Sequence, residues 1–516
     1  MHSANFKRAF TLILLATTAA PTFAQTPPAE DETGLGEIIV TAQRRDENLQ
    51  DVPLSVTAIG GEKLGNISAA GADIRFLSAR VPSLIVESSF GRTFPRFYIR
   101  GLGNTDFDFN ASQPVSLVYD DVVLENPILK GFPVFDIAQV EVLRGPQGTL
   151  FGRNTPAGIV KFDSVKPGKE TNGYLRASYG RFNQVSVEGA VGGQLSGDKA
   201  AARLSVLYQR QDNYVDNVLP GRTTKNALEG YNEFAGRLQL LLKPSEELDV
   251  LLSGQLRTLN GTARVFRANV FTRGQTGLNA NFNRFQVSTD GKNNQEVNTY
   301  NGTARITYDA GPVSLFSVTS YWDGNATSVG DVDGGFGASF LPPNLTGPGV
   351  IPFTAETRDA VPKLKQFTQE FRIASNGDGA LSYQGGVFYF DETLRILSDN
   401  FSTLGDFVGG VGLFTPPGGI NITVDQRQKS KAYGVFASVT YAVTDALKLT
   451  GGIRYNNDKR TFSASRVFDS FPFDFFLAPP LLGTVNRRTQ DDNITWDIAA
   501  NYKATDDVSQ IGRAHV

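Results

Sequence analysis

The stretch that decides the fold is FDIAQVEVLRGPQGTLFGRNTPAGIVKFDSVKP, residues 135–167. It begins as a short alternating strand, breaks at Gly145-Pro146, and closes with a second strand over residues 159–165. Glycine and proline at this density favour tight turns along a fixed path over a helix. The residues before the stretch have the pattern of a small globular unit, and those after it have the pattern of successive β-hairpins. We therefore predict a boundary between a domain and a β-barrel here.

Composition narrows the possible functions. The 516 residues include no cysteine, only two histidines (His2 and His515), and a net charge of -3. These features leave no thiolate metal site, no interior Ser-His-Asp or Cys-His set, and no nucleic-acid signal. Asp331 and Asp333 could hold calcium through two carboxylates, but a flexible acidic loop is the favoured interpretation. We therefore expect no enzyme, catalytic residue, metal site or cofactor, and no nucleic-acid partner.

The first 24 residues have the pattern of a secretory signal peptide. Lys7 and Arg8 form a positive segment, residues 9–20 are largely apolar, and Thr22-Phe23-Ala24 resembles a cleavage site. The apolar part is too short to span a membrane, and nowhere else do about 18 apolar residues follow one another. The sequence predicts export from the cytoplasm without a helical anchor.

A polar leader, residues 25–36, is followed by EIIVTA, residues 37–42. The leader is rich in Pro, Glu and Thr, which favours flexibility. The run after it favours a β-strand. One interpretation is the ordinary first strand of the next domain. The favoured one is an exposed strand that adds to the sheet edge of a partner protein.

From residue 173 onward, segments of about ten residues alternate in polarity. The clearest is 447–456, where apolar side chains at every second position alternate with Lys448, Thr450 and Arg454. One apolar face and one polar face at period two, with tyrosines near strand ends, are typical of a transmembrane β-barrel with a wet lumen.

Short and long connections alternate along the same region. Turns such as Ala310-Gly311 are separated by long stretches such as 322–366. A membrane barrel has short periplasmic turns and longer outer loops, whereas a soluble sandwich has no reason to separate loops by length. We count about twelve strands, with a further one beginning at Val508, and favour the barrel over the sandwich.

Four motifs in order make the chain resemble the TonB-dependent outer-membrane receptors. EIIVTA resembles the TonB box, FYIRGLG from Phe97 resembles the first plug signature, and VYDDVV from Val118 resembles the central plug strand. At this last motif the family often has aspartate and then glycine. VEVLRGPQGTLFGRNTPAGI from Val140 is the most specific match. The resemblance covers nearly the whole mature chain.

The resemblance implies a membrane β-barrel of 22 antiparallel strands with an N-terminal α+β plug domain in its lumen. About 12 to 13 of those strands are expected here, so the chain is expected to be a fragment. The expected parts are a signal peptide (1–24), a flexible leader with the TonB box (25–43), a plug domain (44–167), a truncated barrel (168–510) and a probable non-native tail (511–516).

The resemblance also implies a function. It is active uptake of a scarce nutrient, with an iron–siderophore complex favoured, across the outer membrane of a Gram-negative bacterium. Uptake of glycans or plant-derived aromatics is the alternative within the class, and a passive 12-strand porin-like channel is the alternative outside it. The implied partners are outer-membrane lipid, the small-molecule ligand, and TonB, which would pair with Glu37, Ile38, Ile39, Val40, Thr41 and Ala42.

Further residues take roles from the resemblance. Arg100 and Arg144 are expected to lock the plug to barrel glutamates, of which Glu370 is one, although Glu370 as an ordinary lumen-facing charge is the alternative. The plug loops expected to face outward and bind ligand contain Phe90, Arg92, Phe94, Tyr98, Asn104, Phe107 and Phe109. The tight plug turns are expected at Gly101, Gly103, Gly145, Pro146, Gly148, Gly152 and Gly158.

Overall fold

The computed structural model separates the chain into two units, Met1–Ile38 and Ile39–Val516. It describes residues 38–68, 71–78, 80–153, 155–219, 221–262, 265–267, 270–271, 274–280, 282–333, 354–377, 379–403, 420–468, 483–505 and 508–515. The expected signal peptide and Glu37 of the expected TonB box lie outside the described residues. Every described helix and strand belongs to the unit Ile39–Val516.

The N-terminal part of this unit is a small α+β domain, here called the plug. Its main sheet has the strand order β3-β8-β9-β6-β7, in which β6 and β9 run parallel and the other neighbours antiparallel. The quoted stretch supplies the interior strands β8 and β9, and most of their residues are buried because neighbouring strands flank them on both sides. The elements are β1 Ile39–Val40, β2 Glu47–Asn48, β3 Ser55–Gly60, α2 Gly61–Ile67, η1 Ile74–Leu77, β4 Leu84–Glu87, β5 Arg96–Ile99, β6 Val115–Tyr119, β7 Val122–Leu124, α3 Pro127–Lys130, β8 Ile137–Arg144 and β9 Gly158–Ser164.

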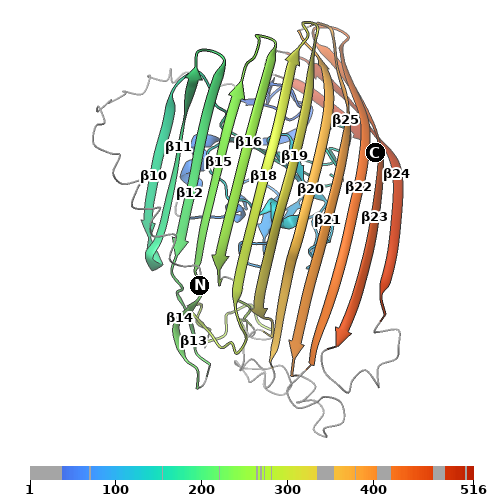
Figure 1. Ribbon diagram of the computed structural model, residues 1–516. Helices are drawn as coiled ribbons and strands as arrows, with labels where there is room; N and C mark the ends of the chain where they lie inside the picture. The colour runs from blue at the N-terminus through green and yellow to red at the C-terminus, as the bar shows by residue number, and fades with distance from the viewer. Residues whose placement is uncertain are drawn as a thin grey trace, which may run out of the picture. The chain divides into compact units, whose positions relative to one another are not determined.

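The remainder forms one antiparallel sheet of 13 strands, each paired with the next in the sheet order (Figure 1). Its strands are β10 Asn172–Gly180, β11 Gln184–Ser196, β12 Ala200–Gln211, β15 Tyr231–Leu242, β16 Leu248–Gly261, β18 Asn294–Asp309, β19 Val313–Asp331, β20 Ala355–Ser375, β21 Leu381–Ser402, β22 Ile420–Ala442, β23 Leu447–Phe468, β24 Val485–Lys503 and β25 Ser509–His515. A small separate sheet contains β13 Val215–Asn217, β14 Thr224–Leu228 and β17 Gln286–Val287. This architecture confirms the predicted fold class of barrel strands with a plug.

The two edges of the large sheet are β10 and β25, and no pairing joins them among the described residues. The structure places Ile511–His515 in β25, with Ile511 opposite Asn501 of β24. The predicted boundary at residue 510 therefore does not coincide with the end of a strand. The non-native origin of residues 511–516 stays a prediction.

The plug packs against one face of the sheet, and side chains alternate accordingly. On β21, Val387 and Tyr389 are exposed on the outer face, whereas Phe388 and Phe390 are buried. The Phe390 ring lies 4.5 Å from the guanidinium of Arg153 in the plug. Period-two alternation thus directs one set of side chains toward the plug and the other toward lipid, as predicted from sequence.

Aromatic side chains form two rows on the outer face. The row nearer the long connections, here called the loop-side aromatic row, has Phe367 and Tyr389 with ring centroids 6.2 Å apart and Tyr433 and Tyr455 at the same separation. The turn-side row contains Tyr308, Tyr383, Tyr441 and Tyr502, all exposed. Two such rows bounding an apolar band are typical of a membrane-spanning barrel. No helix among the described residues is long and apolar enough to cross a membrane.

Connection lengths differ between the two ends of the sheet. Residues 243–247 join β15 to β16, and residues 310–312 join β18 to β19. At the other end, β19 stops at Asp331 and β20 starts at Ala355.

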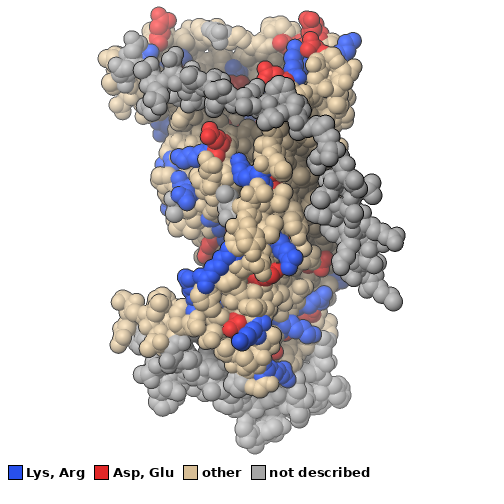
Figure 2. Space-filling model, turned by 90° about the vertical axis from the view of Figure 1, so that its left-hand side faces the viewer, with Lys and Arg blue, Asp and Glu red and all other residues tan. Residues whose placement is uncertain are grey.

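Figure 2, seen from the β10 side, shows basic and acidic side chains interspersed over that face.

Candidate functional site

The most buried polar groups lie where the plug meets the barrel wall, and Glu233 on β15 is the centre of one cluster. Its carboxylate accepts from Arg92 of the plug at 2.8 Å and from Arg257 on β16 at 2.7 Å. The Arg92 guanidinium also donates to Gln209 at 2.8 Å and stacks 4.0 Å from the Tyr231 ring centroid. Burial opposes the charge of Arg92, but the nearby Glu233 and Asp73 carboxylates raise its pKa above the usual value. The prediction of Arg92 as a ligand contact is wrong in placement, because the side chain is 8% exposed and anchors the plug.

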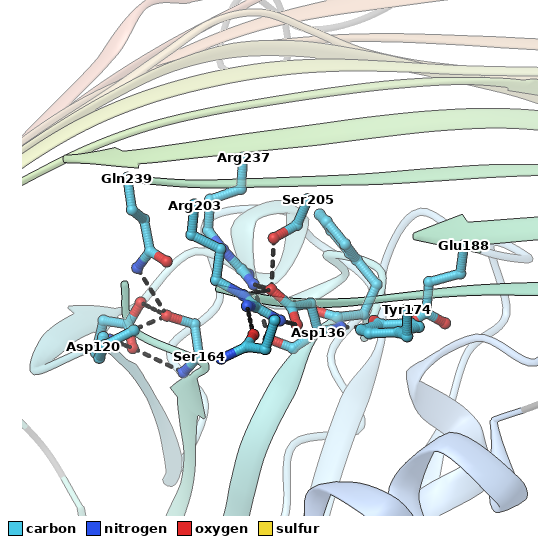
Figure 3. Close-up of polar contacts among 12 residues, drawn as sticks. Asp120, Asp136, Ser164, Tyr174, Glu188, Arg203, Ser205, Arg237 and Gln239 are labelled. Carbon is cyan, nitrogen blue, oxygen red and sulfur yellow. Dashed lines mark hydrogen bonds and ion pairs between the residues drawn. The ribbon is translucent and has the colours of Figure 1, made fainter. Parts of the chain in front are cut away.

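Asp136 is the centre of a second cluster, shown in Figure 3. Its carboxylate accepts from Arg203 on β12 at 2.6 and 2.8 Å and from Arg237 on β15 at 3.2 Å. Ser205 also donates to it. Burial alone would raise the Asp136 pKa, but hydrogen bonds from Arg203 and Ser205 hold it below the usual value. Asp136 has a φ of 49°, so the charged contacts stabilise a backbone conformation that is costly for a non-glycine residue.

The turn between β6 and β7 provides a third anchor. Asp120 and Asp121 have φ angles of 48° and 67°, as a two-residue hairpin turn with two left-handed positions requires. Asp121 occupies the place where the resembled family often has glycine. Its carboxylate pairs with Arg305 on β18 at 2.8 Å. Burial would raise the Asp121 pKa, but the charges of Arg305, Arg372 and Arg44 hold it far below the usual range.

Asp120 and Ser164 continue this contact toward the wall. The Ser164 hydroxyl donates to Asp120 at 2.6 Å, and Gln239 on β15 donates to the Ser164 oxygen at 3.0 Å (Figure 3). Lys166 also pairs with Asp120. Sequence reasoning missed Asp136, Asp120 and Asp121 as anchors, although the aspartate that replaces the family's glycine was a usable signal.

Glu370 on β20 lies in a plug–barrel ion pair, but with a different partner from the expected one. Arg44 donates to its carboxylate, with the two side chains 1% and 7% exposed. The Arg44 guanidinium also lies 4.6 Å from the Phe151 ring centroid. Arg153 makes a similar pair with Asp458 on β23. The seating of the plug therefore depends on residues near the TonB box that sequence reasoning did not select.

The expected lock residues Arg100 and Arg144 make different contacts. Arg144 donates to Pro82 O at 3.2 Å and Ser55 Oγ at 3.0 Å, and also to Thr57, all within the plug. Burial, and then the charge of Arg100, lower its pKa. Among the described residues neither arginine pairs with Glu370. The prediction that they lock the plug to this glutamate is therefore wrong here, because Arg144 donates within the plug and Glu370 pairs with Arg44.

The described part of the expected TonB box packs on the plug from Ile39 onward. Thr41 donates from its backbone N and its hydroxyl to Glu141 Oε1, at 2.8 and 2.9 Å, and Lys161 donates to the same hydroxyl. Val40 and Ala42 are fully buried, whereas Ile39 is 44% exposed. β1 pairs with β2 in a two-stranded sheet. The expected freely exposed strand is thus docked in this structure, because its alternate side chains fit an apolar plug surface.

The loops expected to bind ligand contain both core and surface residues. Phe90, Phe94 and Phe109 are at most 3% exposed and pack on one another, with the Phe94 and Phe109 centroids 4.9 Å apart. Their prediction as ligand contacts is wrong in placement, since they form the core under the loops. Phe107 is 55% exposed and lies 4.6 Å from the Arg96 guanidinium.

Two further loop residues shape the surface beside Phe107. The Tyr98 hydroxyl donates to Glu87 at 2.8 Å and to Asn104 O at 3.0 Å. The Asn104 amide donates to Ser112 O at 2.7 Å. Ser112 in turn accepts from Arg460 on β23 at 2.7 Å. These loops therefore lie at the end of the sheet with the long connections, as predicted.

The expected glycine turns mostly need glycine. Gly158 has a φ of 142°, and a Cβ there would lie 2.2 Å from Leu143 O. At Gly103 a Cβ would lie 2.0 Å from the Tyr98 ring. Positive φ angles also occur at Gly101, Gly145 and Gly152. Gly148 also lies in a turn, but a Cβ there would make only ordinary contacts of 3.7 Å or more, so the available space does not require glycine. The predicted role of Pro146 in a plug turn stays a prediction.

An acidic cluster lies among the long connections. Carboxylate oxygens of Asp290, Asp331 and Asp333 approach within 4.8 Å of one another. Thr289 donates to Asp331 at 2.5 Å, and Thr354 donates to Asp290. Because hydroxyl donors already serve two of these carboxylates, the cluster does not require a cation, and we assign none to it.

Comparison with known proteins places this geometry in context. Residues 48–159 match the family model described as TonB-dependent Receptor Plug Domain. The pesticin receptor of Yersinia pestis is 24% identical over 225 residues, which are 43% of this chain and 32% of that protein. The ferrioxamine B receptor of Salmonella typhimurium is 36% identical over 78 residues, 15% of this chain and 11% of that protein. These relatives are named as receptors rather than enzymes.

Solved structures show the same fold. The ferric yersiniabactin uptake receptor of Yersinia pestis has a TM-score of 0.70 and 17% identity, covering 89% of this chain and 64% of that one. The open form of the ferric-catecholate import receptor of E. coli has a TM-score of 0.65 and 16% identity, covering 93% and 72%. The match therefore spans about a third of the length of the pesticin receptor and about two thirds of the length of the solved yersiniabactin receptor.

Proposed function

This chain carries the plug domain and barrel strands of a TonB-dependent receptor of the Gram-negative outer membrane, and on this premise we propose that it takes up an iron–siderophore complex by TonB-dependent active transport. TonB would bind the segment that begins at Glu37 and pull on the plug. The ligand would bind at the opposite end, on the plug loops beside Phe107 and on the long barrel connections.

The observation that carries the proposal is the contrast between the two ways in which the plug is held. Its body contacts the wall through buried ion pairs at Glu233, Asp136 and Asp121. Removing one partner of such a pair costs about 3–5 kcal/mol. The box segment, by comparison, is held on the plug by a two-residue strand pair, by hydrogen bonds at Thr41 and by the burial of Val40 and Ala42, and its described residues make no ion pair with the wall. A backbone bond of the strand pair contributes about 0.5–1.5 kcal/mol net, and a hydrogen bond to a carboxylate contributes about 1.5–3 kcal/mol.

This contrast supports a pulling mechanism. A segment that is not ion-paired to the wall can leave its docking site and pair with another sheet edge while the plug body remains seated. A passive channel needs neither a plug that fills the lumen nor a detachable strand at its periplasmic end. The contrast therefore favours active transport over the porin-like alternative.

The iron–siderophore substrate is supported by the relatives' names. Among the proteins compared are receptors named for ferrioxamine B, ferric yersiniabactin and ferric catecholates. Transporters named for vitamin B12 and copper are also among them. The exposed Phe107 offers an aromatic surface that suits an aromatic chelate.

Uptake of radioactive iron tests the proposal. The chain is expressed in an iron-starved host that lacks its own siderophore receptors, with and without TonB, and supplied with a panel of ferric siderophores. We expect uptake of at least one complex, abolished by loss of TonB or by a protonophore. Uptake that persists without TonB would overturn active transport. TonB-dependent uptake of vitamin B12, glycans or plant aromatics, with no ferric siderophore accepted, would overturn the iron substrate alone.

A further inference from the structure

A basic groove of about 790 Å³ crosses β20 to β24 toward the ends with long connections. Six cationic side chains line it, and no acidic side chain does so among the described residues. The cations are Lys363, Arg395, Arg427, Lys429, Arg487 and Arg488. Uncharged residues of β21, β22, β23 and β24 complete the lining. This concentration of one charge sign contrasts with the mixed charges on the face seen in Figure 2.

The groove opens on the outer face of the barrel. Leu394 on β21 is 1% exposed and belongs to the apolar cluster that contains the plug core. Its neighbours Thr393 and Arg395 must point the other way, because side chains alternate along a strand. Arg395, Arg427 and Lys429 side chains are 40%, 67% and 50% exposed. A nutrient bound in the lumen therefore cannot reach these cations.

The height of the groove follows from the strand register. Thr393 and Lys429 are paired, four residues beyond Tyr389 and Tyr433 of the loop-side aromatic row. Four residues advance about 13 Å along a strand, or about 10 Å along the membrane normal at a tilt of about 40°. The cations thus begin just beyond the aromatic row, where lipid headgroups meet water.

Acidic neighbours neutralise only part of this charge. Asp425 pairs with Arg395 and with Arg427, at 3.0 and 3.1 Å. Asp391 pairs with Lys431 at 3.3 Å and lies 4.0 Å from Lys429. Two carboxylates therefore serve four cations, while Lys363 and Arg488 add further positive charge on the outer face. Arg487 is in register with Phe462, Gln428 and Leu394, so its side chain lies on the lumen face.

We propose that this groove binds the phosphate groups of a phosphorylated glycolipid in the outer leaflet of the outer membrane. Arginine forks bind phosphate through two parallel hydrogen bonds, and lysine adds a point charge. A lipid headgroup fits better than a soluble anion, because the groove faces away from the lumen and lies directly beyond the aromatic row. The bound lipid would cover the outer ends of β20–β24 and hold them in register, independently of which nutrient the receptor carries.

Binding of lipid A to the full chain in detergent micelles tests the proposal. The variant replaces Arg427, Lys429 and Arg488 together by glutamine. The matched control replaces Lys169, Lys199 and Lys243 by glutamine, which removes the same charge near the short turns. Circular dichroism and heat-modified gel mobility establish that all three proteins have the same fold.

We expect the wild type and the control to bind bisphosphorylated lipid A alike, and the groove variant to bind it at least ~10-fold more weakly. Dephosphorylated lipid A should bind the wild type as weakly as the variant binds the phosphorylated form. Equal binding of phosphorylated lipid A by the wild type and the groove variant would overturn the proposal. So would displacement of the lipid by millimolar inorganic phosphate, since the groove would then be a site for free phosphate. If the groove variant misfolds, the single Lys429→Gln and Arg488→Gln variants give the same comparison, with an expected partial loss.

Discussion

Single buried charges decide how firmly the plug is seated. Glu370 and Arg44 are both nearly inaccessible to solvent, and so each depends on the other for its electrostatic partner. Arg44 lies two residues after Ala42 of the docked box segment, so this pair connects the box region to the barrel wall. A change at Glu370 should therefore be detected at the box.

We expect Glu370→Gln to weaken the seating of residues 39–45. Loss of one charge from a buried pair costs about 3–5 kcal/mol, because the remaining ion is left desolvated without its counter-charge. Trypsin should then cleave after Arg44 and Arg45 faster than in the wild type. Glu296→Gln on β18 is the control, since Glu296 is exposed and hydrogen-bonds only a neighbouring asparagine. Equal cleavage rates for the wild type and Glu370→Gln would contradict the role of this pair.

Lys130 gives a pH-dependent test at the same scale. It is fully buried in the plug, donates to Val115 O at 2.9 Å, and burial lowers its pKa to about 8. Between about pH 8 and the usual lysine value near 10.4, the folded state holds fewer protons than the unfolded state. The Lys130 contribution to stability therefore rises with pH across that window.

The free energy of plug unfolding should show this dependence. The difference between the wild type and Lys130→Met, measured in urea at several pH values, should shift in favour of the wild type by about 3 kcal/mol from pH 8 to 10.5. Below pH 8 the difference should be constant. A difference that does not change up to pH 10.5 would show that Lys130 titrates normally.

The sequence predicted least well which residues pair with one another at the site and which of them are buried. Glu370 was selected, but its partner Arg44 lies 326 residues away, and no sequence pattern connects the two positions. Phe90, Phe94 and Phe109 were interpreted as surface aromatics because a Gly-rich loop offers no periodicity by which to separate core from surface. The substitution of Asp121 at a glycine position was noticed, but its partner Arg305 depends on how the plug docks.

At the scale of elements, the two loops above the plug core combine a buried aromatic cluster with an exposed tip. The Phe90 and Phe94 centroids are 5.4 Å apart, and Phe107 lies 6.4 Å from Phe90 at the surface. The cluster keeps the loops in place, while the tip is available to a ligand.

Elements with a clear period were predictable from the sequence. The barrel strands were identified because lipid on one face and the plug on the other impose strict alternation of side chains. The docked conformation of β1 was not, because Glu141 and Lys161 come from strands far along the chain.

Two alanine variants separate the cluster from the tip. Phe94→Ala should destabilise the plug by about 3–5 kcal/mol, the usual cost of removing a buried ring. Phe107→Ala should change stability by no more than about 0.5 kcal/mol, because its ring is largely exposed. Urea unfolding of the plug, followed by hydrogen exchange, measures both. Similar losses in the two variants would contradict the division between core and tip.

At the scale of the whole molecule, connection length separates the two ends of the sheet, and the plug carries its box contacts at the short-turn end. Arg45 donates to Tyr383 O near that end, whereas Asn110 donates to Gln426 near the other. The box thus lies on the side where short periplasmic turns are expected, and the ligand loops lie on the side of the long connections. This polarity was predictable from sequence because short and long connections alternate after the first hairpin.

Single cysteines test this polarity, and the absence of native cysteine removes any background. Lys225→Cys lies in β14 among the long connections, and Ser245→Cys lies in the short turn between β15 and β16; both positions are exposed. A membrane-impermeant maleimide should label Lys225→Cys on intact cells, and Ser245→Cys only after the outer membrane is permeabilised. The reverse pattern would place the box on the wrong side of the membrane for TonB.

The central claim is that a strand formed by the box transmits force to the plug, and iron uptake by a box variant tests it most directly. Ile39→Pro removes a backbone N–H and prevents regular strand pairing, while Ile39→Val keeps a strand-forming side chain. With the best ferric siderophore from the panel, we expect binding in the cold to be equal in the wild type and both variants. Uptake should fall to the TonB-minus level in Ile39→Pro and stay near the wild-type rate in Ile39→Val. Full uptake by Ile39→Pro in cells with TonB would contradict the account.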